Sequence, residues 1–329
     1  MKQKSVIISS LLFICLALVF LSRNSKEDES SDNNSNKFSD IILDTYIERE
    51  ELDSAINYID NIYKENPDDI DILIARADTY YEANQAHISR DCWEHCLEID
   101  SDNIICSENL VELYCSIGDL NCENNIDYLL ELDSENLIAL YFKAKLNKDL
   151  GENELAIQIY NEILDIKPDH LGALEDLALL YTYQNDEMAI QYFEKLLEEK
   201  ETYQVYYNYG YYFQLQEDFL NAIEKYEFSI SLNENWPYSY YSMGYCYLAS
   251  AFSSKDELEN KELLQKALNI FDKTISLDGG YLEAYHGRGL CYQELGNKKA
   301  AMEDFKFCLM IEPGYEPAMN GISDLEKSQ

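Results

Sequence analysis

The feature that most constrains the fold of this chain is a spacing of residues that recurs along it. A small residue is followed by a second small residue twelve positions later, and by an aromatic residue four positions beyond that. Small residues on two paired helices let their backbones approach closely, and an aromatic side chain fills the space that opens beside them. The spacing therefore predicts a repeated helical hairpin. The clearest examples are Ala144, Ala156 and Tyr160; Gly210, Ala222 and Tyr226; and Gly289, Ala301 and Phe305.

The same organisation extends over most of the sequence. From about Lys37 onward, apolar residues recur at helical spacing in pairs of short segments, separated by turns rich in Asn, Asp and Gly. No strand pattern interrupts them. A chain of stacked hairpins grows by adding units, so its 329 residues are compatible with one elongated domain.

These units resemble the tetratricopeptide repeat, a helix-turn-helix unit of about 34 residues with the same order of small, small, aromatic and proline residues. Pro67, Pro168 and Pro313 stand at the closing turn. The resemblance implies an all-α fold, a right-handed α-solenoid of about eight helix-turn-helix repeats within residues 38-329. The repeats are expected at about 36-69, 70-103, 104-136, 137-170, 171-202, 203-236, 237-281 and 282-315, followed by a closing helix at 316-327.

Some positions depart from the repeat pattern. The usual small residues are altered at Ser89, Val111 and Cys122 in the second and third repeats. In the seventh, 23 residues separate Gly244 from Ala267, where Gly210 and Ala222 are twelve apart. Residues 254–257 form a capping-box pattern before a second helical segment, so both helices of this hairpin are expected to be long.

The first residues form a targeting pattern that is separate from the repeats. Lys2 and Lys4 precede a mostly apolar segment at 6–21, which makes 1-22 a signal-anchor or a signal peptide. Residues 23-37 are almost all polar and are expected to be a flexible tether. Either alternative exports the repeats: anchored by a single membrane pass and outside the cytoplasm, or secreted if the segment is cleaved.

The charge of the chain limits its partners. It has 63 acidic against 25 basic residues and a formal net charge of -38, which creates a field that repels phosphates. Nucleic acid is therefore not expected as a partner, and a protein or peptide, basic in character, suits this field better. The favoured interpretation is simpler, namely that the charge only keeps a large surface soluble.

The sequence gives no pattern typical of catalysis or cofactor binding. Phosphate-binding and dinucleotide-binding glycine loops are absent, no paired carboxylate pattern stands out, and His87, His170 and His286 have no partnered nucleophile. His95 lies between Cys92 and Cys96, yet the paired spacing of metal ligands is missing. Buried thiols, disulfides and a metal site are the alternatives for the cysteines at 92–122, and thiols are favoured. We expect no enzyme activity, no cofactor and no metal.

Two classes of function remain. The first is a non-enzymatic scaffold that binds a partner segment in a concave groove; the alternative is a structural or assembly subunit of an envelope or membrane complex that uses its edges or ends. In the family that the chain resembles, the first helix of each hairpin lines the groove. The corresponding positions here are rich in tyrosine, which offers a large rigid contact area and a hydroxyl group. The predicted groove residues are Tyr141, Tyr207, Tyr211, Tyr238, Tyr241, Tyr245 and His286.

Overall fold

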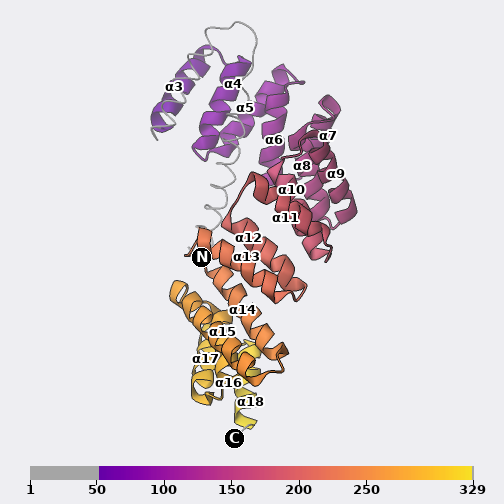
Figure 1. Ribbon diagram of the computed structural model, residues 1–329. Helices are drawn as coiled ribbons and strands as arrows, with labels where there is room; N and C mark the ends of the chain where they lie inside the picture. The colour runs from indigo at the N-terminus through magenta and orange to yellow at the C-terminus, as the bar shows by residue number, and fades with distance from the viewer. Residues whose placement is uncertain (1–51, 328–329) are drawn as a thin grey trace. The chain divides into compact units, whose positions relative to one another are not determined.

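The computed structural model describes residues 52–327, and every regular element in this range is an α-helix, which confirms the predicted all-α class. Contacts divide the chain into two compact units between Leu113 and Tyr114. Within each unit, the helices follow one another in chain order (Figure 1). The predicted targeting segment 1-22, the tether 23-37 and the first helix of the first predicted repeat lie outside the described residues.

The first unit contains three complete helices and most of a fourth: α3 (Leu52–Glu65), α4 (Ile70–Glu82), α5 (Ala86–Ile99) and α6 (Ile104–Ser116). Ala77 of α4 and Trp93 of α5 are buried together with Ser89, whose hydroxyl donates to the Ala77 carbonyl at 2.7 Å. Ser89 thus takes the place of the usual small apolar residue, because its polar group is satisfied inside the hairpin.

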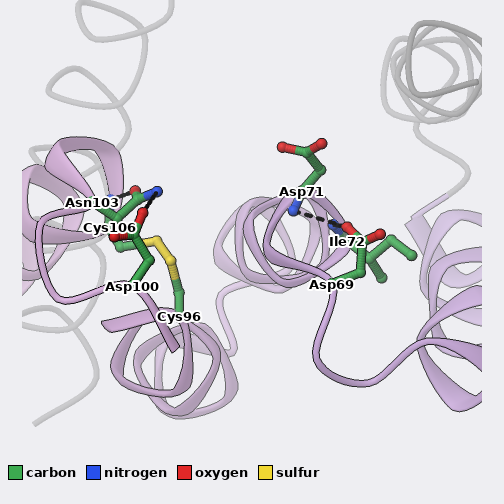
Figure 2. Close-up of a disulfide and its surroundings, with 7 residues drawn as sticks. All are labelled: Asp69, Asp71, Ile72, Cys96, Asp100, Asn103 and Cys106. Carbon is green, nitrogen blue, oxygen red and sulfur yellow. Dashed lines mark hydrogen bonds between the residues drawn. A yellow bond between two sulfur atoms is a disulfide. The ribbon is translucent and has the colours of Figure 1, made fainter. Parts of the chain in front are cut away.

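Two disulfides flank α6. Cys96 and Cys106 join α5 to α6 in the first unit (Figure 2), and Cys115 and Cys122 close the loop that leads to α7 in the second. The favoured interpretation as buried thiols is therefore wrong for these four, while Cys92 is a buried thiol. The turns bring the paired Cα atoms to 6.5 and 4.7 Å, and sequence spacing alone does not define such distances.

The second unit continues with helical hairpins. Its helices are α7 (Cys122–Leu132), α8 (Leu137–Asp149), α9 (Asn153–Ile166), α10 (Leu171–Tyr183), α11 (Met188–Glu199), α12 (Tyr203–Leu215), α13 (Phe219–Leu232), α14 (Pro237–Ser253), α15 (Glu257–Leu277), α16 (Leu282–Glu294), α17 (Lys298–Ile311) and α18 (Glu316–Lys327). Each helix packs on the next, and α18 packs on α16 and α17 at the end of the series. Among residues 52–327, no helix combines the length and hydropathy needed to cross a membrane.

The aromatic residue of a hairpin occupies the space predicted for it. Phe271 of α15 is fully buried, and its ring lies against Gly244 of α14 on one side and Gly287 of α16 on the other. A Cβ atom at these glycines would lie 2.8 and 2.6 Å from the ring. Phe305 has the same relation to Gly289 and Gly321. The glycines therefore make room for a ring that is shared by successive hairpins.

The seventh predicted repeat has the long helices expected of it. α14 has 17 residues and α15 has 21, whereas α12 and α13 have 13 and 14. The capping residue differs from the expected Ser254: the Asp256 carboxylate accepts from the backbone N–H groups of Leu258 and Glu259. Ser254 instead donates to the Glu259 side chain at 2.7 Å. The carboxylate lies closer to the start of the helix, so it takes over the capping role.

We expect Gly244→Leu to lower the free energy of unfolding by about 1–3 kcal/mol or more, because the new side chain must displace the buried Phe271 ring. Gly314→Leu is the matched control, since a Cβ atom at Gly314 meets nothing within 4 Å. Thermal and urea unfolding of both variants measures the difference. Equal stability of the two variants would show that the Gly244 contact does not limit packing.

Candidate functional site

The tyrosines of α12 and α14 divide into buried and accessible sets. Tyr209 and Tyr240 are buried, and Tyr206 stacks on Phe228 with ring centroids 5.1 Å apart. Tyr247 is half-buried and packs against the core residues of two neighbouring hairpins, α12–α13 and α14–α15. These four rings pack against neighbouring side chains of the repeats. The remaining tyrosines therefore define the surface available for recognition.

Three tyrosines form a packed layer, which we call the aromatic floor: Tyr207 of α12, Tyr241 of α14 and Tyr281 at the start of α16. Tyr207 packs on Tyr226 at 5.7 Å between centroids, and Tyr241 packs on Tyr281 at 5.0 Å. Tyr207 also shares a side-chain hydrogen bond with Ser242. Since each ring is held by another ring or by a hydrogen bond, the floor is rigid.

The ring contacts continue beyond the predicted residues. The ring centroid of Trp236 lies 5.1 Å from that of Tyr203 and 4.9 Å from that of Tyr238. The ring centroids of Tyr238 and Tyr281 are 5.8 Å apart. Trp236 and Tyr281 were missed by sequence reasoning because they precede their helices as N-cap residues, outside the helical face that was counted. Both are aromatic residues directly before a first helix, and this shared position could have indicated them as site residues.

Three accessible tyrosines lie beside this floor, and we call them the tyrosine face: Tyr211, Tyr238 and Tyr245. Tyr211 and Tyr245 follow Tyr207 and Tyr241 by one helical turn, which places each pair on the same side of its helix. Tyr238 and Tyr245 retain 47% and 43% exposure, and Tyr211 is half-buried. Their rings are therefore accessible above a layer that is already packed.

Two predicted residues make their contacts elsewhere. Tyr141 of α8 packs on Tyr160 at 6.0 Å and on His170 at 5.4 Å. His286 of α16 packs on Phe305 and Tyr315 at 5.8 and 5.6 Å. The structure thus groups five of the seven predicted residues, Tyr207, Tyr211, Tyr238, Tyr241 and Tyr245, around α12 and α14.

The imidazoles have structural surroundings. The His170 Nδ1 atom accepts the Ala173 N–H at 3.1 Å, which caps α10 and requires that nitrogen to be unprotonated. Burial lowers the pKa of His170 and of His286. Both side chains are therefore favoured in the neutral form near neutral pH.

The aromatic floor has an acidic neighbour. Burial raises the pKa of Tyr241, and the Glu283 carboxylate raises it further. Burial followed by Glu283 also raises the pKa of Tyr315. Glu283 itself is exposed near the start of α16. A carboxylate beside the electron-rich faces of several rings makes this surface attractive to cations.

Two lysines of α8, Lys145 and Lys148, interact with side chains of the second unit. Lys148 forms an ion pair with the buried Asp176, which also accepts from the Tyr160 hydroxyl at 3.0 Å. The Lys145 ammonium lies 5.6 Å from the Tyr141 ring centroid. Lys148 is thus part of a network with the buried Asp176 and Tyr160 side chains.

Arg288 of α16 is likewise held inside the second unit. It pairs with Asp304 of α17 at 2.7 Å and with Asp272 of α15 at 2.6 Å. Its guanidinium therefore links α16 to both α15 and α17.

The cysteine and histidine groups do not gather around a common point. In the part of the chain that the structure describes, no set of three or more His, Cys, Asp or Glu side chains is arranged to hold a metal ion. His95 lies 3.2 Å from the Asp68 carboxylate. Cys92 instead accepts a hydrogen bond from Arg76 at 3.0 Å.

Comparison with known proteins supports the repeat assignment. The family model of the tetratricopeptide repeat matches residues 137–170 and 282–315. A TPR repeat-containing protein of Methanocaldococcus jannaschii is 24% identical over 295 residues, which cover 85% of this chain and 46% of that protein. The chain therefore spans less than half the length of this relative.

Two solved structures share the fold. A tetratricopeptide repeat protein from Parabacteroides merdae has a TM-score of 0.53 and 19% identity, over 78% of this chain and 98% of the other. A chain of the APC/C hetero-tetramer Cut9–Hcn1 has a TM-score of 0.53 and 13% identity, over 88% of this chain and 56% of that chain. At these identities the likeness concerns the fold alone.

The family match identifies tetratricopeptide repeats at residues 137–170 and 282–315, and the helical hairpins around them have the α-solenoid architecture of such repeats. Arrays of this kind present extended surfaces to other proteins. The fold is accordingly that of a scaffold for protein–protein interaction.

We expect the buried tyrosines to make the fold sensitive to alkaline pH. Burial raises the pKa of Tyr209 to about 12, and burial also raises the pKa of Tyr207 and Tyr241. A raised pKa means that the folded protein holds the phenolic proton more tightly than the unfolded chain. The stabilisation is thus complete below about pH 10 and is lost as the pH rises through the folded-state value.

Urea unfolding at pH 8 to 12 measures this effect, with absorbance near 295 nm as a probe of tyrosine ionisation. Tyr209→Phe should reduce the loss of stability above pH 10, because it removes one of the protected hydroxyl groups. An identical pH dependence in the wild type and this variant would contradict the assignment to Tyr209.

Proposed function

We propose that this chain is a non-enzymatic scaffold that binds an extended segment of a partner protein on the tyrosine face. The observation that carries the proposal is the unbroken series of ring contacts from Tyr203 through Trp236, Tyr238 and Tyr281 to Tyr241. These residues belong to three successive first helices or to the turns before them. A segment that crosses these helices would meet aromatic surface throughout.

The packed floor favours binding because little has to be ordered. Tyr207 and Tyr241 already have fixed neighbours, so their rings lose little freedom when a ligand arrives. The exposed rings of Tyr238 and Tyr245 then supply contact area and hydroxyl groups at a small entropic cost. The two sets of tyrosines therefore have different roles in the proposed site.

The charge distribution favours a basic or proline-containing segment. Glu283 borders the aromatic floor, and the whole chain has a net charge of -38. A Lys or Arg side chain of the partner would gain from the carboxylate and from the ring faces together, at about 0.5–2 kcal/mol for each ring contact. Proline rings pack well on tyrosine in an extended segment that needs little further ordering.

The test is a variant that removes exposed rings and leaves the floor intact, Tyr211→Ser with Tyr238→Ser and Tyr245→Ser. We expect partner segments captured by the wild type to bind at least about tenfold more weakly, from the loss of several aromatic contacts. Isothermal calorimetry with each captured segment, at low and high salt, measures the change.

The matched control replaces exposed aromatic residues away from this face, Tyr128→Ser with Phe228→Ser. Thermal unfolding must first show that the variants are folded to the same extent. Unchanged affinity in the triple variant, or an equal loss in the control, would remove the tyrosine face as the binding site.

We also propose that the repeats act in an oxidising compartment outside the cytoplasm. The support is the pair of disulfides, Cys96 with Cys106 and Cys115 with Cys122, because structural disulfides are typical of exported proteins. The other described cysteines, at 92, 246, 291 and 308, are buried thiols.

For protein isolated from its native source without reductant, we expect four of the eight cysteines after Cys15 to react with iodoacetamide in denaturant. All eight should react after reduction. Intact mass spectrometry counts the modified thiols. Eight reactive thiols without reductant would show that the protein matures in a reducing compartment.

A further inference from the structure

A second set of apolar side chains is exposed on the second unit, at the turns that join the first and second helices of its hairpins. Their exposure ranges from 42% for Leu215 to 94% for Leu120. Isolated exposed leucines are common, but a set at equivalent turns of successive repeats is a patterned surface. We call this set the turn edge: Leu120, Leu150, Tyr183, Leu215, Leu220 and Leu258.

Two of the turns that carry these residues are in direct contact. The Gln216 side-chain amide donates to the Asn185 side-chain carbonyl, which joins the turn after α10 to the turn after α12. Tyr183 and Leu215 are the last residues of these two helices. Figure 1 shows the hairpins of α10 to α13 following one another. Because each repeat stacks on the next, equivalent turns form a row along one edge.

The first of these turns is held in place covalently. The disulfide between Cys115 and Cys122 closes the loop that carries Leu120. Within the loop, the Asp119 N–H donates to the Tyr114 carbonyl at 2.8 Å, and its carboxylate accepts the Asn121 N–H at 2.9 Å. An almost fully exposed leucine on a constrained loop is a preorganised apolar contact, since little freedom remains to be lost on binding.

Acidic residues accompany the apolar ones at these turns. Glu152, Glu187 and Glu217 are exposed beside Leu150, Tyr183 and Leu215. Among the ion pairs formed within residues 52–327, none involves these three carboxylates. A second copy of this chain would bring the same negative charges against them. An occupant with apolar and cationic residues side by side satisfies both features of the surface.

The turn edge adjoins the tyrosine face on α12 and is distant from it on α14. Tyr211 of the tyrosine face precedes Leu215 of the edge by four residues, about 6 Å along the helix axis. Tyr238, by contrast, lies at the start of α14, at the opposite end of that helix from the turn that leads to Leu258.

We propose that the turn edge is a second docking surface, which binds a cationic amphipathic segment of a partner protein through apolar contacts flanked by ion pairs. The apolar side chains supply affinity and the surrounding carboxylates select for Lys and Arg. This surface adds aliphatic and acidic contacts to those of the tyrosine face.

The test uses two synthetic 18-residue peptides of equal charge, one an amphipathic helix of Leu and Lys and the other with Ser in place of Leu. We expect the wild type to bind the Leu/Lys peptide at least tenfold more tightly in fluorescence anisotropy. Leu150→Ser with Tyr183→Ser and Leu220→Ser should reduce this affinity to that of the Ser/Lys peptide. Higher salt should weaken binding of both peptides.

Two variants serve as controls. Ile166→Ser with Leu232→Ser and Met310→Ser removes the same number of exposed apolar residues near the ends of second helices. Tyr238→Ser with Tyr245→Ser alters the tyrosine face. Both should retain the preference for the Leu/Lys peptide. Equal affinity for the two peptides, or equal losses in the edge and control variants, would overturn the proposal.

Two further measurements distinguish other occupants. In analytical ultracentrifugation, we expect the wild type and the edge variant to have the same oligomeric state. A dimer abolished by the edge substitutions would make a second copy the occupant and overturn the proposal. Edge-dependent binding to vesicles of phosphatidylcholine and phosphatidylglycerol, with no peptide preference, would overturn it in favour of a lipid surface.

Discussion

The structure depends on the contact between an aromatic ring of one helix and the glycine or alanine residues of the helices on either side. Phe271 and Phe305 each lie between glycines of successive hairpins, at distances that leave no room for a Cβ atom. The contact sets how closely the first and second helices approach, and it links each hairpin to the next. A repeat array has no single central core, so these local contacts maintain its continuity.

The same contact determines where the accessible tyrosines lie. Tyr226 is fixed against Gly210, and Tyr207 packs in turn on Tyr226. Tyr241 has a similar relation to Phe271, which is itself fixed by Gly244. The aromatic floor is thus an extension of the hairpin core toward the surface. A binding surface supported in this way is held in shape before any partner arrives.

The two proposed binding surfaces differ in their chemistry because they occupy different parts of the first helices. The tyrosine face combines rings and hydroxyl groups over a packed floor. The turn edge combines aliphatic side chains, such as Leu220, with carboxylates in short turns such as that at Glu217. Both are bordered by negative charge, which is the reason that a cationic partner is proposed for each, while their shape and polarity differ.

The sequence by itself determined the hairpin, because the spacing of Gly244, Ala267 and Phe271 reflects contacts within a single repeat, and such local contacts leave a regular pattern. The helical spacing also placed Tyr207 and Tyr211, and likewise Tyr241 and Tyr245, one turn apart on their helices. The tertiary structure alone decided the disulfide pairing and the role of Trp236 and Tyr281, since these depend on how turns from neighbouring repeats come together. Helical periodicity carries no information about residues in turns, and the distances between them are set by stacking.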